Sequence, residues 1–473
     1  MIYSVDKNSE GAISLSQNFE GARVTVVGLG IEGIDLVRFL AARGASVTVS
    51  DARPAEQLGE ALAAIEDVGA RLALGGNRDA DLLAADCVFA SQGVPPDLPA
   101  LRAARRAGVP ISSMTRLFLE LCPAPVAGIT GSSGKTTTTA LVGAMLEASG
   151  ADYVVGGNIG VGLLGLLDEI EPATKVVLEL SHTQLQSVEQ SPHVACVTNV
   201  TPNHLDAYSW ASYVALKRRI FEFQRPDDIA IFHIDDEVAA GFADEAPGIV
   251  RYSSVERPLP GDGATVSGGV VVRVEDGREH ALLDRDEIPL RGAHNVANVV
   301  SAVAVAAQLG VDDAAAARAV RGFRGIPHRL EVVAGGEGAV TWVNDSIATT
   351  PERALAGLRS FEQPLVLLLG GRDKHLPLTE LAHEAVARCR AVIGFGEAAP
   401  VFLRAVAAAR DGTTPALQQV DDLEAAAAAA AAVAQPGDIV LCSPAGTSFD
   451  AYRNFEQRGA AFRAAVAAVT GDA

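Results

Sequence analysis

The sequence is poor in cysteine, in basic residues and in long apolar runs. Its 473 residues include five cysteines, an odd number without CxxC spacing. Scattered cysteines of this kind are expected to be reduced core thiols of a cytoplasmic enzyme. No stretch of about 18 uncharged apolar residues occurs, and the first residues lack a basic segment followed by an apolar one. We therefore expect no membrane insertion and no secretion by a standard signal.

Basic residues are outnumbered by acidic ones. The 38 lysines and arginines face 58 aspartates and glutamates, which gives a formal net charge of −20. A protein that binds nucleic acid through its phosphates needs a broad basic face, so nucleic-acid binding is not expected. No repeat of 20–50 residues is visible, which excludes solenoid folds. At 49% hydrophobic residues the chain can fill two or three domain cores.

Apolar β-branched runs alternate with alanine-rich segments of helical period along the whole chain. This pattern predicts an α/β fold with mostly parallel sheets. The first block reads as a strand at 24–27, a glycine turn, a helix at 34–43 and a strand at 46–50. A second block opens with a strand at 126–129, and a third contains four apolar strands. We place the domain boundaries near residues 115 and 326.

Two segments depart from this alternation. Residues 266–283 (VSGGVVVRVEDGREHALL) read as a hairpin added to the sheet of the second block. The alanine run 425–432 has low complexity, but alanine is the best helix former, so we predict a plain helix that ends before Pro436 and Gly437.

The strongest single motif is GITGSSGKTT at 128–137, between a predicted strand and a predicted helix. Glycines let backbone amides surround phosphate oxygens, the lysine adds a positive charge, and the following hydroxyl can bind Mg²⁺. The usual first glycine of this motif would stand at 129, where this chain has isoleucine. The motif predicts a nucleoside triphosphate site. Its residues are Gly131, Ser132, Ser133, Gly134, Lys135, Thr136 and Thr137.

A second glycine motif, GLGIEG, follows the first predicted strand. Gly28, Gly30 and Gly33 fit the dinucleotide fingerprint, and Asp51 closes the next strand as a candidate ribose or base partner. On its own the motif would indicate NAD. A phosphate loop in the next block makes a nicotinamide cofactor redundant, so another nucleotide is the favoured ligand.

Three candidates for cation chemistry lie in the second block. Glu179 ends a strand, and His204 and Asp206 follow another. A hard cation between a nucleotide and an acceptor needs oxygen ligands, and a histidine can add a nitrogen. The alternative for His204 is a residue that caps a loop. Lys217 lies in a helical segment, where an exposed lysine is the ordinary expectation.

Further candidates come later in the chain. Asn295 and Asn298 share one face of a predicted helix, where they could contact a purine or cap the helix. In the third block polar residues follow the apolar strands and are expected to line one rim of the sheet. They are Asp345, Ser346, Thr349, Lys374 and the segment from Ser448 to Phe455. A lysine with hydroxyl groups on that rim would suit a substrate with a carboxylate.

Ten motifs in this order resemble the Mur ligase family over nearly the whole chain. They are ITGSSGKTT, GGNIG, LELSHTQL, VTPNHLD, LKRRIF, GAHNVAN, IPHR, NDSIATT, GGRDK and SPAGTSFDAYRNFEQRG. The resemblance implies a three-domain architecture. Residues 1–115 would form a Rossmann-like domain for the UDP substrate, 116–325 a central P-loop ATPase domain, and 326–473 a dinucleotide-binding-type domain that holds glutamate.

The resemblance also implies roles for single residues. Lys135, Lys217, His204 and Glu179 would be catalytic. Lys217 would be carbamylated and would bind Mg²⁺ with Thr136, Glu179 and His204. Besides the phosphate loop, ATP would contact Asn295, Asn298, Arg329 and Asp345. The UDP substrate would contact Gly30, Ile31, Glu32, Asp51, Asn158 and Ser181. Glutamate would contact Thr349, Lys374, Ser448 and Phe455.

The implied reaction is an ATP-dependent ligation. ATP would phosphorylate the L-alanyl carboxylate of UDP-N-acetylmuramoyl-L-alanine, and the amine of D-glutamate would attack the acyl phosphate. We expect ATP and Mg²⁺ as cofactors, small molecules as the only partners, a monomer, and a cytoplasmic location. Addition of L-glutamate is the alternative. Less favoured are a folylpolyglutamate synthase-like enzyme, a non-catalytic ATP-binding subunit and a nicotinamide oxidoreductase.

The sequence departs from the family's usual pattern in four places. Ile347 replaces the lysine of the DSKATN motif, and His182 and Thr183 replace serine and phenylalanine in ELSSFQLE. Glu32 replaces a threonine or serine and places a negative charge near the expected diphosphate. An SPG loop has become residues 91–93 (SQG). Several of these positions lie near the expected UDP and glutamate sites.

Overall fold

The computed structural model describes residues 19–158, 163–203, 208–290, 292–336, 338–374 and 376–471. Residues up to Phe323 form one compact unit and residues from Arg324 form a second. All five cysteines are described, and none forms a disulfide. Four of them are buried, as expected for core thiols, and Cys122 is half-buried.

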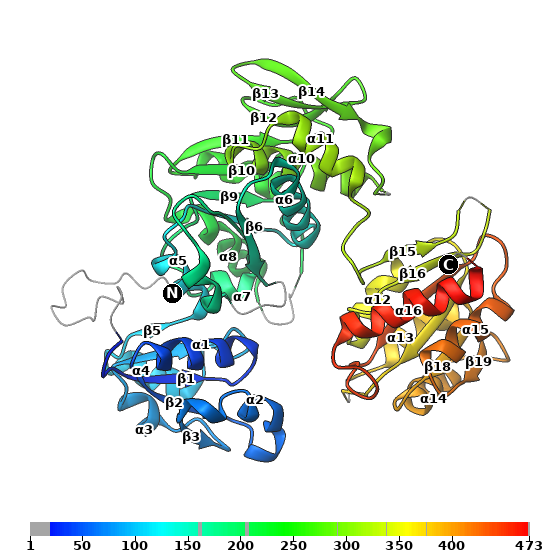
Figure 1. Cartoon of the computed structure of the whole chain (residues 1–473), viewed down its shortest axis with the longest axis horizontal. Helices are drawn as coiled ribbons and strands as arrows, with labels where there is room; N and C mark the ends of the chain where they lie inside the picture. The colour runs from blue at the N-terminus through cyan, green and yellow to red at the C-terminus, as the bar shows by residue number, and fades with distance from the viewer. Residues whose placement is uncertain are drawn as a thin grey trace. The chain divides into compact units, whose positions relative to one another are not determined.

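A five-stranded parallel sheet with the order β3-β2-β1-β4-β5 forms the N-terminal domain (Figure 1). The reversal of strand order between β1 and β4 opens a crevice at their carboxyl ends, where such sheets bind ligands. The strands are β1 (Arg23–Val27), β2 (Ser46–Asp51), β3 (Arg71–Leu74), β4 (Cys87–Ala90) and β5 (Ile111–Ser112). The α-helices are α1 (Ile31–Ala42), α2 (Gly59–Ala63), α3 (Asp79–Leu83), α4 (Pro99–Arg106) and α5 (Met114–Leu121).

The first two predicted strands are confirmed to within one residue, but helix α1 begins three residues before the predicted start at 34. Gly33 belongs to the helix rather than to the turn. A Cβ atom on Gly33 would lie 2.1 Å from the carbonyl oxygen of Gly28, so only glycine allows the first turn of α1 to pack this closely on the preceding loop.

The central domain is built on a nine-stranded sheet with the order β14-β13-β12-β11-β10-β9-β6-β8-β7. The strands are β6 (Val126–Thr130), β7 (Tyr153–Gly157), β8 (Lys175–Glu179), β9 (Val194–Val197), β10 (Ile229–His233), β11 (Ile249–Ser253), β12 (Gly263–Ser267), β13 (Val270–Glu275) and β14 (Arg278–Asp284). The α-helices are α6 (Lys135–Ser149), α7 (His182–Leu185), α8 (Trp210–Glu222), α9 (Glu237–Gly241), α10 (Ala293–Gln308) and α11 (Asp313–Gly322).

Strand β6 lies between β8 and β9, and both of its faces are buried. Ala127 and Ile129 pack in one core with residues of α6, α10 and α11. Val126 belongs to a second core, which contains residues of α8 and extends into the N-terminal domain. This burial on both faces fixes the position of the loop that follows β6.

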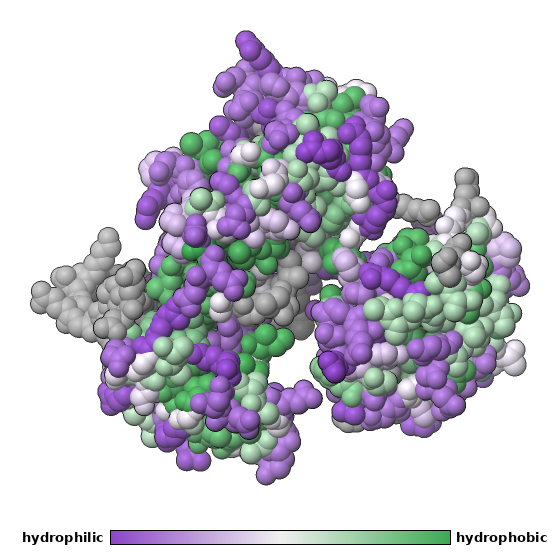
Figure 2. Space-filling view, in the orientation of Figure 1, coloured by the Kyte–Doolittle hydropathy of each residue, from purple (hydrophilic) through white to green (hydrophobic). Residues whose placement is uncertain are grey.

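The segment predicted as one hairpin forms two. Strands β12, β13 and β14 run antiparallel to one another at the edge of an otherwise parallel sheet. Gly268, Gly269 and Gly277 have positive φ angles in the two tight turns. Figure 2 shows mainly hydrophilic side chains over this end of the central domain.

The second unit contains a six-stranded sheet with the order β15-β16-β20-β17-β18-β19, in which only β15 is antiparallel. The strands are β15 (Glu331–Ala334), β16 (Thr341–Asn344), β17 (Leu365–Gly370), β18 (Cys389–Phe395), β19 (Ala416–Gln419) and β20 (Ile439–Ala445). The helices are α12 (Pro351–Arg359), α13 (Thr379–Arg388), α14 (Ala399–Ala409), α15 (Leu423–Val433) and α16 (Phe455–Thr470). Helix α15 confirms the predicted alanine helix. Across the described ranges, no helix is both long enough and apolar enough to cross a membrane.

Candidate active site

The phosphate-loop motif forms a tight turn from β6 into α6. Gly131 and Gly134 both have positive φ angles. A Cβ atom would lie 2.0 Å from Thr198 Oγ1 at the first position and 2.3 Å from Asn298 Oδ1 at the second. Ile129, where the usual motif has its first glycine, is instead a core residue of β6. The turn that requires glycine therefore begins two residues later.

Asn199 holds the loop in this shape. Its backbone carbonyl accepts a hydrogen bond from the amide of Ser132, and its side-chain Oδ1 accepts one from the amide of Ser133, each at 2.9 Å. Asn199 was not predicted as a site residue. Its position just after strand β9 was the available signal.

Lys135 begins α6 and folds back over the loop. Its Nζ donates to the carbonyl oxygens of Gly131 and Ser132, at 3.0 and 3.2 Å. Thr136 and Thr137 follow in the first helical turn, half-buried. The N-terminus of this 15-residue helix, the glycine turn and the lysine together provide the positive electrostatic environment that phosphate oxygens require.

Lys217 is buried, so the expectation of an exposed helix lysine is wrong. It projects from α8, is 1% exposed, and its Nζ donates to the carbonyl of Gly131 at 2.8 Å and to Thr130 Oγ1 at 3.2 Å. Burial lowers the pKa of Lys217 well below its usual value, and repulsion from Lys135 lowers it further, while Glu179 acts in the opposite direction. The chain therefore holds a weakly basic amine beside the phosphate loop.

Arg219, two residues further along α8, contacts a different element. Its guanidinium donates to the carbonyls of Leu185, at 2.9 Å, and Val188, at and beyond the end of α7. The two side chains of α8 therefore bind the helix to the phosphate loop and to α7 at once.

Glu179 carries an unsatisfied buried oxygen. It ends β8, is 3% exposed, and its Oε1 accepts a hydrogen bond from Asn158 Nδ2 at 3.0 Å. Its Oε2 is buried and has no hydrogen-bond partner among the described residues. Since an unpaired buried carboxylate oxygen is unfavourable and a hard divalent cation prefers such ligands, Glu179 fits a Mg²⁺ ligand.

The described residues contain no cluster of three or more histidine, cysteine, aspartate or glutamate side chains that could hold a metal. From the described residues as they stand, a Mg²⁺ ion here would receive a hydroxyl and one carboxylate, beside water and phosphate oxygens, which are usual ligands in nucleotide sites. His204 and Asp206 lie outside the described residues, as do the last two residues of the GGNIG motif.

The asparagine pair on α10 lies against the phosphate loop. Asn298 Nδ2 donates to Asn295 Oδ1 at 3.0 Å, and Asn298 Oδ1 accepts from Thr138 of α6 at 3.4 Å. The predicted shared helix face is confirmed. Asn298 is buried beneath the loop, and Asn295 is half-buried at its side.

In the N-terminal domain, Asp51 organises the glycine turn. Its Oδ2 accepts from the amide of Leu29 at 2.8 Å, and its carboxylate pairs with Arg53. Burial alone would raise the pKa of Asp51, but the hydrogen bonds from Arg53 and Leu29 outweigh it and lower that pKa. Gly30 and Ile31 are exposed at the mouth of the turn. Arg53 was missed, although it stands two residues beyond a strand end.

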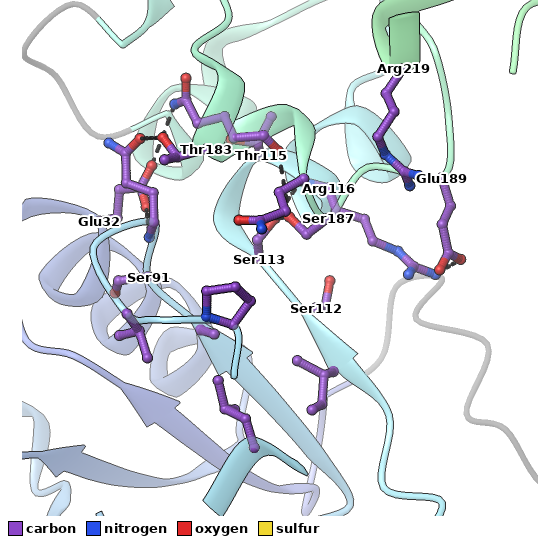
Figure 3. A pocket seen from close by; sticks show the side chains of 18 of the residues that line it. Glu32, Ser91, Ser112, Ser113, Thr115, Arg116, Thr183, Ser187, Glu189 and Arg219 are labelled. Carbon is purple, nitrogen blue, oxygen red and sulfur yellow. Dashed lines mark hydrogen bonds and ion pairs between the residues drawn. The ribbon is translucent and has the colours of Figure 1, made fainter. Parts of the chain in front are cut away.

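Glu32 differs from Gly30 and Ile31 in that it is not exposed. Its side chain is buried, and its carboxylate accepts hydrogen bonds from Gln92 and Gln184. Ser181 begins α7, where its side chain forms a capping box with Gln184. Both glutamines line a pocket between the N-terminal and central domains (Figure 3).

In the second unit, three candidate loops leave neighbouring parallel strands at the same edge of the sheet, as predicted. Thr349 follows β16, Lys374 follows β17 and Ser448 follows β20. Ser448 is buried, Thr349 is half-buried and Lys374 is exposed. Phe455 begins α16, half-buried.

Arg458 lies beneath these loops and was not predicted. It is fully buried, at 0% exposure, and donates to Ser346 Oγ at 3.0 Å, to the carbonyl of Ser346 at 2.9 Å and to that of Gly446 at 3.0 Å. A single arginine in a helical pattern gives no signal of such burial, because arginines on helices are ordinarily exposed.

Asp345 is the second buried charge of this unit. Its carboxylate accepts from Ser443 Oγ at 2.7 Å and from the amide of Leu330 at 3.2 Å. Burial raises its pKa to about 6 in spite of these hydrogen bonds. Arg329 is exposed on the loop before β15, and Ile347 is half-buried.

Family models match three consecutive parts of the chain. The Mur ligase MurD-like N-terminal domain matches residues 22–113, the Mur ligase middle domain 129–306, and the Mur ligase glutamate ligase domain 328–446. A UDP-N-acetylmuramoylalanine--D-glutamate ligase of Symbiobacterium thermophilum is 43% identical over 95% of this chain and 98% of its own length. The chain belongs to the Mur ligase family.

Other members of the Mur ligase family agree with this assignment. A protein of Roseiflexus sp. with the same name is 40% identical over 95% of this chain and 99% of its own. The solved structure of UDP-N-acetylmuramate-alanine ligase MurC from Thermotoga maritima has a TM-score of 0.53 at 18% identity and covers 96% of this chain and 100% of that one. It shows the shared three-domain fold. Mur ligases in general use ATP and Mg²⁺.

Proposed function

We propose that this protein is an ATP-dependent ligase of peptidoglycan precursor synthesis that joins D-glutamate to UDP-N-acetylmuramoyl-L-alanine, with release of ADP and phosphate. The observation that carries the proposal is the combination of 43% identity over nearly the full length with a phosphate loop that lies beside Glu179 and Lys217. Relatives at 35–43% identity bear the D-glutamate name, which favours D-glutamate over L-glutamate. Because the substrates are nucleotides of cell metabolism, we place the reaction in the cytoplasm.

The first step transfers the γ-phosphoryl group of ATP to the L-alanyl carboxylate, so two anions must approach each other. Lys135 and the loop amides offset that repulsion, and the α6 N-terminus points its dipole at the phosphates. Asn295 and Asn298 would contact the nucleotide. Thr136, Glu179 and His204 would hold Mg²⁺, which when bound adds positive charge to the phosphate oxygens.

We include carbamylation of Lys217 in the proposal. Only an uncharged amine attacks CO₂, and burial beside Lys135 favours the uncharged form. The nitrogen of the uncharged amine would bond to the carbon of CO₂ and lose one proton to solvent, which gives an anionic carbamate with oxygen atoms that can bind a metal. Lys217 Nζ now donates to the carbonyl of Gly131, and this contact would be exchanged for a metal contact.

The second step is attack of the glutamate amine, as the free base, on the acyl phosphate, with loss of phosphate. Thr349, Lys374, Ser448 and Phe455 would hold the amino acid, with Lys374 binding one of its carboxylates. Gly30, Ile31 and Asp51 of the N-terminal domain and Asn158 of the central domain would hold the UDP substrate. Arg329 and Asp345 would contact ATP from the loops of the second unit.

The experiment that tests the proposal is phosphate release from ATP and Mg²⁺ with UDP-N-acetylmuramoyl-L-alanine. Parallel reactions contain D-glutamate, L-glutamate or no amino acid. Turnover with D-glutamate alone supports the proposal, and turnover with L-glutamate alone replaces the acceptor. Absence of turnover in all three would leave an ATP-binding protein with another acceptor or no catalytic role.

The role of Lys217 has its own test. Lys217→Ala should abolish ligation while the thermal unfolding midpoint shows an intact fold. Short carboxylic acids should restore part of the activity, since their carboxylates can occupy the space of the carbamate. Full activity of the variant without added carboxylate would remove Lys217 from the mechanism.

A further inference from the structure

Glu32 stands where a negative charge is least expected. It is the second residue of α1, directly after the glycine turn that would receive a diphosphate, and an anion there would repel the substrate. The structure buries Glu32, which is 9% exposed, and its carboxylate accepts hydrogen bonds. Burial raises the pKa of Glu32, and the nearby Asp35 adds to the effect.

Both carboxylate oxygens of Glu32 accept hydrogen bonds from neutral groups. The backbone amide of Gln92, in the loop after β4, donates to Oε2 at 2.9 Å. The side-chain Nε2 of Gln184, on α7 of the central domain, donates to Oε1 at 3.4 Å. Glu32 therefore connects the glycine-turn helix, the loop beside it and the central domain.

The orientation of Gln184 is fixed by its own partners. Its Oε1 accepts from the amide and the hydroxyl of Ser181, at 3.0 and 3.1 Å. The NH₂ group must then face Glu32, so the contact needs an acceptor on α1. The side chain of Gln92 continues the network, because its Oε1 accepts from Thr183 at 3.0 Å and lies 3.2 Å from Ser181 Oγ, whose one hydrogen can go to either glutamine.

The network contains three of the four places where the sequence departs from the family's usual pattern. Glu32, Gln92 and Thr183 are far apart in sequence, yet they meet at one end of the pocket in Figure 3. Ser181, which all three reach directly or through a glutamine, is two residues beyond Glu179. The network therefore joins the substrate-binding turn of one domain to the strand end that carries the candidate Mg²⁺ ligand of the other.

We propose that Glu32 is a positioning residue that fixes α1 and the 91–93 loop against α7. It would thereby set the distance between a nucleotide substrate held by the N-terminal domain and the phosphate loop. This inference rests on the proposed function. It assigns Glu32 a role in alignment between domains rather than in direct contact with the diphosphate.

The test exchanges donor and acceptor across the contact. Glu32→Gln keeps one acceptor for two donors, so its NH₂ group would meet either the NH₂ of Gln184 or the backbone amide of Gln92. In Gln184→Glu two carboxylates would face each other. The double variant Glu32→Gln with Gln184→Glu restores one donor, one acceptor and one negative charge. We expect each single variant to lower kcat at least about tenfold, with KM for ATP within about twofold, because a small misplacement of substrate slows the chemical step. The double variant should return kcat to within about threefold of wild type.

A matched control is Asp35→Asn, one turn along α1. Asp35 also faces the central domain, where its Oδ2 accepts from the amide of Leu164 at 2.8 Å, but it does not contact Gln184. Combining Asp35→Asn with Gln184→Glu should give no recovery. Thermal unfolding of the ligand-free variants provides a second readout. Each single variant should lower the unfolding midpoint, and the double variant Glu32→Gln with Gln184→Glu should restore it.

Wild-type kcat in Glu32→Gln, or a double variant no better than the worse single one, would overturn the inference. If the wild-type protein shows no turnover, the proposed function has failed, and the unfolding midpoints then decide whether the contact exists. If Glu32→Gln does not fold, recovery of folding and kcat by the double variant supports the inference, and failure to recover overturns it.

Discussion

Two sets of polar side chains lie at the carboxyl ends of parallel strands, one in the central domain and one in the second unit, and they differ in how their charges are satisfied. In the central domain Lys135 and Lys217 donate hydrogen bonds to backbone carbonyl oxygens, and Glu179 has a buried oxygen with no hydrogen-bond partner among the described residues. In the second unit Arg458 and Asp345 are bonded to chain atoms. The first arrangement leaves groups that the proposed function assigns to a ligand, whereas the charges of the second are satisfied by hydrogen bonds within the chain.

The largest effect on the reaction rate is expected from removing a lysine of the phosphate loop in the central domain. Lys135→Ala should lower the rate of phosphate release by a factor of about 10³ or more, since a lost contact to transition-state charge is worth several kcal/mol. The thermal unfolding midpoint should stay near that of wild type. A large loss of stability with little loss of rate would show that Lys135 supports the fold rather than the reaction.

Removing a buried charged side chain of the second unit should act mainly on stability. Arg458→Leu would leave the carbonyls of Ser346 and Gly446 buried without donors, and we expect a loss of about 3–5 kcal/mol in the free energy of unfolding. Denaturant unfolding measures this loss. Arg404→Leu, on the exposed side of α14, is the matched control and should change little. Equal effects at both positions would show that the hydrogen bonds of Arg458 are unimportant.

Asp345 should give a smaller, pH-dependent effect. Its folded pKa of about 6 lies above the ordinary 3.8, so folding favours the protonated form. Its contribution to stability is therefore complete below about pH 4 and is lost as the pH rises through about 6. Asp345→Asn stays neutral, and the difference in unfolding free energy between variant and wild type should change across this window. A difference that is independent of pH would refute the raised pKa.

The smallest effect is expected for an exposed ion pair away from both sets. Arg38 and Asp67 pair at 2.9 Å with side chains that are 50% and 63% exposed. Solvent and salt screen such a pair, so Asp67→Asn should leave the unfolding midpoint and the turnover rate unchanged within error. A clear shift in the midpoint would show that surface pairs also stabilise the N-terminal domain.

Much of the fold could be predicted because it depends on local patterns. Apolar strands, glycine turns and the alanine helix have signals within a few residues, and the common rim for Thr349, Lys374 and Ser448 follows from strands that end at one edge of a sheet. In the β12–β14 segment one hairpin was predicted where the structure has two. The turn at Gly277 was not distinguished from the turn at Gly268 and Gly269.

The burial of single side chains could not be predicted in this way. Helical period does not tell which face of α8 turns to the phosphate loop, so Lys217 was separated from ordinary lysines only by the family resemblance. The direction of Glu32 depends on Gln92 and Gln184, which are 60 and 152 residues away in sequence. Such contacts arise from packing within and between domains and leave no signal in the neighbouring sequence.

Helix α8 also constrains how this sequence can change over evolution. Lys217 and Arg219 reach opposite neighbours from positions two residues apart, so deletion of the residue between them would rotate one contact by about 100° relative to the other. Changes of length before Ser209 or after Phe223 would leave both contacts in register. Related lineages should therefore gain and lose residues on either side of this helix and keep its length.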